Sequence, residues 1–214
     1  MTAIRIGYSL EGPFDYRVVP ILLRRLAEET LGETVTVEQL PPPPGRLRRG
    51  HGLIASLPAD AEVLRELEAE IIVAIVDTDN TRVMECLTTL RDARDRVQPS
   101  PLCFALGVAV RSIEAWLLAD EQAIRAALID DTYGDQAVPR QPAPETLPDP
   151  KTHLNNLISD LTDGIEPGVD PFAEAIAEHI DLQALRDRCP RFDGLATEFV
   201  NCVRRVLRIR QIDV

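Results

Sequence analysis

Runs of apolar residues along the chain mark four strands. Alternating, β-branched or continuous apolar residues occupy Ile4 to Leu10, Thr34 to Leu40, Ile71 to Val76 and Phe104 to Val110. The third run is apolar at every position, which is typical of a strand covered on both faces. A strand of that kind belongs in a parallel sheet.

Amphipathic segments separate these strands. Apolar residues recur at helical spacing over Asp15 to Leu31, and helices are also expected over Pro58 to Glu68, after a cap at Asn80, and over Ser112 to Asp120. Strand and helix therefore alternate along the chain. This alternation predicts an α/β fold with a mostly parallel, Rossmann-like sheet, helices on both faces, and a site at the carboxyl ends of the strands.

The second half of the chain reads differently. Residues 129–150 form a proline-rich loop, and residues 151–214 read as a helical part packed on the α/β core of residues 1–128. We interpret the loop as an excursion rather than a linker, so the chain is expected to be one domain overall. Helices are predicted near Thr152 to Leu161, Phe172 to Ile180 and Leu195 to Arg210.

Charge narrows the range of functions. The formal net charge is −12, which argues against a general nucleic-acid coat, because proteins that neutralise many phosphates usually present a basic face. No apolar stretch approaches the roughly 20 residues that a membrane span needs, and no export signal opens the chain. The expected location is the cytoplasm, without a membrane partner.

The four cysteines give no sign of a metal site. Cys86, Cys103, Cys189 and Cys202 are scattered, without a C-x-x-C pair or a histidine at ligand spacing. We predict reduced, mostly buried thiols.

Carboxylates follow two of the predicted strands. Glu11 comes just after the first strand, and Asp77 and Asp79 come just after the third. Because the carboxyl ends of parallel strands share one edge of the sheet, these carboxylates are expected to converge. Hard oxygen ligands in small number suit Mg²⁺ or Mn²⁺, which points to phosphoryl transfer. The alternative is that Asp77 and Asp79 cap the following helix and Glu11 opens a turn.

These positions resemble the Toprim superfamily, which occurs in topoisomerases, primases and overcoming-lysogenization-defect (OLD) nucleases. The likeness rests on a first strand ending in Glu11-Gly12 and an apolar strand ending in Asp77-Thr78-Asp79. The resemblance implies that Glu11 is a general acid or base and that Asp77 and Asp79 are metal ligands.

A closer resemblance is to a poorly characterised bacterial Toprim-like family, and it spans most of the chain. It is carried by the segments Val110 to Asp120, Asp149 to Lys151 and Cys189 to Phe192. The resemblance implies that Glu114 completes the acidic site and that Asp120 lies near it. Taken alone, Glu114 reads equally well as the solvated face of a helix.

Basic residues near the expected site have two interpretations each. Arg46, Arg48 and Arg49 either follow a nucleic-acid backbone or solubilise a loop, and Lys151 either holds a phosphate or starts a helix. A second basic patch lies on the last predicted helix. If the substrate is a polynucleotide, both patches are expected to flank the acidic site; the second comprises Arg204, Arg205 and Arg208.

The leading hypothesis is a Mg²⁺- or Mn²⁺-dependent phosphoryl-transfer enzyme, most simply a nuclease acting on DNA or RNA. The metal ligands are Glu11, Asp77 and Asp79, and the catalytic set adds Glu114. One alternative is a non-catalytic Toprim-like subunit that works with a separate ATPase, which the acidic charge favours. Another is a hydrolase of small phosphoesters. No P-loop motif is present, so ATP binding of that type is not expected.

Overall fold

A four-stranded, all-parallel sheet forms the centre of the protein. The structure is a computed structural model and describes residues 3–32, 36–43, 51–78, 82–97, 103–128, 137–166 and 168–212. The strand order is β2-β1-β3-β4, and every pairing is parallel. The predicted α/β fold with a parallel sheet is thus confirmed. The strands are β1 (Ile4–Ser9), β2 (Val37–Gln39), β3 (Ile71–Thr78) and β4 (Cys103–Val110).

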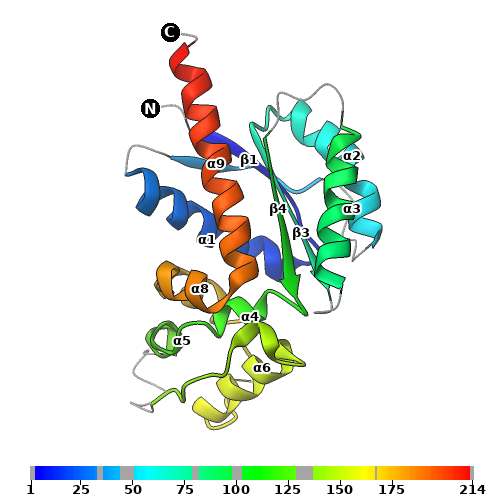
Figure 1. The fold of residues 1–214 in the computed structure, drawn as a ribbon. Coiled ribbons are helices and arrows are strands. Elements are labelled where there is room, and N and C mark those ends of the chain that lie inside the picture. The colour runs from blue at the N-terminus through cyan, green and yellow to red at the C-terminus, as the bar shows by residue number, and fades with distance from the viewer. Residues whose placement is uncertain are drawn as a thin grey trace.

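Helices cover both faces of this sheet (Figure 1). On one face lie α1 (Pro13–Leu31) and α9 (Pro190–Ile212), and on the other lie α2 (His51–Glu66) and α3 (Val83–Asp95). The continuous apolar run of β3 serves both layers, because successive side chains point to opposite faces. Facing α1 and α9 are Ile71, Val73 and Ile75; facing α2 and α3 are Ile72, Ala74 and Val76.

A group of short helices covers the carboxyl ends of the strands, below the tip of β4 in Figure 1. The predicted helix over Ser112 to Asp120 is a single turn, α4, because residues 113–119 are buried throughout and leave no polar face for a longer surface helix. The group comprises α4 (Glu114–Leu117), α5 (Glu121–Leu128), η2 (Pro144–Thr146), α6 (Pro150–Leu161), α7 (Ala173–His179) and α8 (Leu182–Arg188).

Several predicted boundaries were wrong. The second helix begins at His51, and Pro58 lies inside it, because apolar residues at helical spacing continue upstream to Leu53. The last helix begins at Pro190 instead of Leu195, and α8 was not predicted. The third strand extends to Thr78, so Asp77 lies within it.

The last helix is bound to the sheet by a disulfide and by polar contacts near its end. Its Cys202 forms a disulfide with Cys103 of β4, so the prediction of reduced thiols was wrong for this pair. Near its end, Arg210 donates to the carbonyl of Ala3 and pairs with Glu70. Because Ala3 and Glu70 precede β1 and β3, α9 runs from the carboxyl edge of the sheet to its amino edge.

Among the residues that the structure describes, no helix is long and apolar enough to cross a membrane.

Candidate functional site

A cleft of about 680 Å³ opens at the carboxyl edge of the sheet. It lies where β1, β3 and β4 end and where α1, α3 and α6 begin. This is the position at which ligands bind in open parallel sheets. Its acidic lining residues are Glu11, Asp15, Asp77, Glu114 and Asp149, and its basic ones are Arg82, Arg111 and Lys151.

The carboxylate of Glu11 joins the ends of β1 and β3. Its Oε1 accepts a hydrogen bond of 3.0 Å from the backbone N–H of Asp77, and its side chain is 7% exposed. The two residues meet because β1 and β3 are paired neighbours, with Ser9 opposite Ala74. The structure thus places Glu11 and Asp77 together at one edge of the sheet. Asp79 lies outside the described residues.

Asp15 is an acidic residue of the cleft that the sequence analysis did not identify. Its Oδ2 accepts from the backbone N–H groups of Glu11, at 3.2 Å, and Gly12, at 3.0 Å. The pKa of Asp15 is raised to about 6, first by burial and further by the charges of Glu114 and Glu11, against the lowering effect of the backbone donors. An acid in a first helical turn is ordinarily read as a surface residue, so the sequence carried no signal for this site.

Glu114 is a buried wall of the cleft. It is 4% exposed, so the interpretation as the solvated face of a helix was wrong. Its Oε1 lies 3.6 Å from Nζ of Lys151, whose side chain is 65% exposed. The carboxylate is therefore part of the buried wall of the cleft, and the ammonium lies at its exposed mouth.

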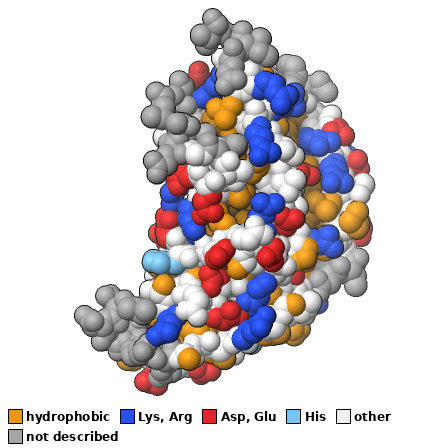
Figure 2. Space-filling view, turned by 60° about the vertical axis from the view of Figure 1, so that its left-hand side comes forward, with side chains coloured by type: hydrophobic (Ala, Val, Ile, Leu, Met, Phe, Trp, Pro, Cys, Tyr) orange, Lys and Arg blue, Asp and Glu red, His pale blue; other side chains and the backbone are white. Residues whose placement is uncertain are grey.

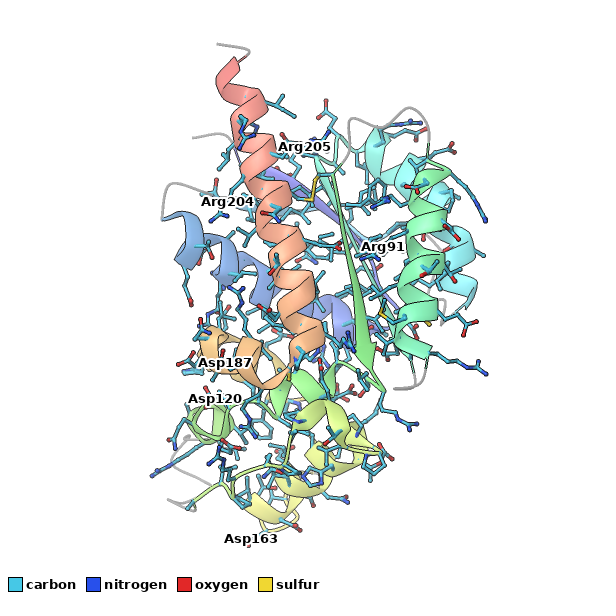
Figure 3. The ribbon with its side chains drawn as sticks, in the orientation of Figure 1. Arg91, Asp120, Asp163, Asp187, Arg204 and Arg205 are labelled. Atoms are coloured by element: carbon cyan, nitrogen blue, oxygen red, sulfur yellow. A yellow bond between two sulfur atoms is a disulfide. The ribbon has the colours of Figure 1, made fainter. Side chains whose placement is uncertain are left out.

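Asp120 has a structural role. It caps α5 through the N–H groups of Gln122 and Ala123 and accepts from the N–H of Asp181, which precedes α8. Figure 3 labels it among the short helices of the lower half, and it is not one of the residues that line the cleft. That it lies near the acidic site, as the resemblance implied, stays a prediction.

The donor chemistry fits a divalent cation held by few protein ligands. Among the described residues, no three His, Cys, Asp or Glu side chains are grouped so as to hold a metal. Glu11, which follows β1, and Asp77, within the neighbouring β3, both line the cleft and carry hard oxygen donors. That set suits Mg²⁺, which binds through one or two carboxylates and completes its shell with water and substrate phosphate.

The two basic patches do not both flank the cleft. Arg46, Arg48 and Arg49 lie outside the described residues. Arg204 and Arg205 lie on the later half of α9, toward the amino edge of the sheet (Figure 3). The expectation for this second patch was wrong because α9 runs away from the cleft. Figure 2 shows basic and acidic side chains interspersed on the face drawn.

Comparison with protein families gives a match over most of the chain. The model of the family described as "Domain of unknown function (DUF4276)" matches residues 10–199. Neither curated proteins nor solved structures give a match.

Proposed function

This chain belongs to the DUF4276 family, and we propose that it is a divalent-metal-dependent phosphodiester hydrolase, most simply a nuclease acting on DNA or RNA. The proposal places the reaction in the acidic cleft at the carboxyl edge of the sheet. It also includes the relationship to Toprim-like proteins that the motifs of the chain imply.

One observation carries the proposal. The hydrogen bond between Glu11 and the N–H of Asp77 joins two strand ends inside a cleft that Glu114 also lines. Buried carboxylates gathered in this way raise each other's free energy unless a proton or a cation neutralises them. A site that tolerates such charges is suited to a cation and to a reaction in which charge develops on phosphate.

Each acidic residue has a distinct part in this proposal. Asp77, with Asp79, would hold Mg²⁺ or Mn²⁺, which supplies an activated water and neutralises charge on the phosphate. Glu11 is oriented by its bond to the N–H of Asp77, and its other oxygen is the group that would take or give a proton. Glu114 stabilises the ammonium of Lys151 at the edge of the cleft.

A second candidate is a non-catalytic subunit that works with a separate ATPase. The net charge of −12 favours this candidate, because an acidic surface repels a polyanion and suits contact with a basic protein partner. The two candidates differ in one measurable respect, since only the hydrolase needs the carboxylates of the cleft for a chemical step.

The test is a Mg²⁺ and Mn²⁺ titration with plasmid DNA, single-stranded DNA and RNA as substrates. We expect cation-dependent cleavage by the parent and a loss of at least about 100-fold in Asp77→Ala, because one metal ligand is removed. Asp163→Asn is the matched control, since Asp163 is an exposed carboxylate beyond the far end of α6, at the lower edge of Figure 3.

The hydrolase proposal fails if the parent cleaves none of the three substrates and its melting temperature does not respond to either cation. A native-state ligand must stabilise the fold, so an unresponsive melting temperature at millimolar cation means that no metal binds.

A further inference from the structure

Three exposed basic residues line the mouth of the acidic cleft. Arg82 precedes α3, Arg111 follows β4, and Lys151 lies in the first turn of α6. They come from three separate elements of the fold, so their convergence is a property of the tertiary structure. Neither Arg82 nor Arg111 has a role in the metal-dependent step proposed above.

Arg111 is held in place by its backbone. Its φ of 69° lies in the left-handed region, which is unfavourable for a residue with a Cβ. Its N–H donates to the carbonyl of Thr78 at 2.7 Å and so extends the pairing of β4 with β3 beyond Val110. Arg111 therefore starts directly beside the end of β3, one residue past the position opposite Thr78.

Arg111 and Lys151 lie near a common neighbour at the mouth of the cleft. Asp149 is exposed there, and its pKa is lowered first by the N–H and hydroxyl of Thr152 and further by the charges of Lys151 and Arg111. Both cations therefore lie within electrostatic reach of one carboxylate. Behind them, Glu114 is buried and contacts Lys151.

We infer that Arg111 and Lys151, with Arg82 at the start of α3, form a phosphate-binding rim at the mouth of the acidic cleft. This inference rests on the proposed function and names the class of substrate, an ester that carries an anionic phosphate to the rim. A guanidinium offers paired donors to phosphate oxygens and an ammonium adds a compact charge, while the carboxylates beneath exclude an unneutralised anion from the floor.

The rim is small. Its cations are confined to the cleft, and the patch of α9 lies at the opposite edge of the sheet. Among the described residues, this distribution suits one or two phosphates rather than the backbone of a long duplex. The terminal phosphate of a nucleic-acid strand and the phosphate of a small ester offer the same anionic oxygens to these cations.

The test is binding of inorganic pyrophosphate, measured by calorimetry in metal-depleted buffer. We expect Arg111→Gln and Lys151→Gln each to weaken binding by at least about tenfold, because a charge-assisted hydrogen bond is lost. Arg204→Gln removes the same charge from α9, at the other edge of the sheet, and should leave binding unchanged.

Arg111→Gly separates a binding role from a structural one. Glycine adopts a positive φ without strain, so this variant should keep the parent's melting temperature and still lose pyrophosphate binding. A loss of melting temperature with intact binding would make Arg111 a structural residue only. The inference is overturned if the parent does not bind pyrophosphate, or if the rim variants bind it as the parent does.

The same measurements distinguish failure of the rim from failure of the proposed function. Asp77→Asn should lose cleavage and the response to Mg²⁺ but retain pyrophosphate binding. If the parent cleaves nucleic acid while the rim variants bind pyrophosphate normally, only the inference about the rim is wrong. If the rim binds pyrophosphate and no substrate is cleaved, only the proposed hydrolase activity is wrong. Competition against pyrophosphate then identifies the source of the phosphate. The competitors are single-stranded DNA with a 5′-phosphate, the same DNA without it, and a mononucleotide.

Discussion

Replacing Asp15 by asparagine should stabilise the protein at neutral pH and leave its stability unchanged in acid. The carboxylate of Asp15 is largely buried between the backbone donors of Glu11 and Gly12 and the negative side chains of Glu11 and Glu114. Asparagine keeps an acceptor oxygen for the same N–H groups but carries no charge. The change therefore removes the electrostatic penalty while preserving the hydrogen bonds.

The sign and size of this change in stability follow from the pKa of Asp15, which rises from 3.8 to about 6 on folding, mainly through burial. Because the folded state then binds the proton more tightly, stability is highest below about pH 4 and falls as the pH rises to 6. Above that range the penalty is complete. At about 1.36 kcal/mol for each pKa unit, the upper bound is roughly 3 kcal/mol.

The assay is thermal or urea unfolding of parent and variant between pH 4 and pH 8. The expected gain at pH 7.5 is about 1 to 3 kcal/mol, or several degrees in melting temperature for a chain of this size, and it should vanish near pH 4. Asp181→Asn is the matched control, because Asp181 also accepts from two backbone N–H groups, of Gln183 and Ala184, but is exposed.

A variant with the same stability difference from the parent at every pH would refute this account of Asp15. So would a gain of equal size in Asp181→Asn, since the benefit would then come from the cap and not from burial among carboxylates.

Two further predictions concern stability. Glu11→Ala removes this acceptor from the N–H of Asp77 and should lower the free energy of unfolding by about 1 to 3 kcal/mol. Glu11→Gln keeps an acceptor and should cost clearly less, so equal losses in chemical unfolding would contradict the role of the hydrogen bond. The disulfide between Cys103 and Cys202 closes a loop with a sequence separation of 99, so its reduction should lower the free energy of unfolding by up to roughly 4 to 5 kcal/mol. The melting temperature of Cys202→Ala should be insensitive to reductant.

The strands and the meeting of Glu11 with Asp77 were predictable because both depend on short-range pattern. A continuous apolar run such as Ile71 to Val76 is typical of a strand covered on both faces, and such strands belong to parallel sheets. Once β1 and β3 are parallel, their carboxyl ends share an edge, and residues that end those strands are brought together.

Other features depended on packing and could not be predicted. Pro58 resembled a helix start, but buried neighbours upstream continued the helix through it. Cys103 and Cys202 pair because α9 lies along β4, a contact that no local pattern of either residue indicates. The positive φ of Arg111 occurs where its N–H bonds to Thr78, at a residue that has no glycine- or asparagine-like preference for this conformation.

The acidic net charge of the chain does not prevent it from binding a phosphate, because the net charge and the local charges at the cleft act over different distances. A net charge of −12 repels a polyanion at long range, but at physiological salt such repulsion is screened beyond about 8 Å. Inside that distance the local charges decide, and at the mouth of the cleft these are the three cations Arg82, Arg111 and Lys151 beside the exposed carboxylate of Asp149. Three cations neutralise at most three phosphates, which for a single strand limits the logarithmic salt slope to about 2. A steeper slope requires cations beyond this rim, and one such group is the loop arginines Arg46, Arg48 and Arg49, which precede the cleft-lining residue Ile54 in the sequence. The salt dependence of binding therefore separates a substrate that touches only the cleft from a strand that continues past it.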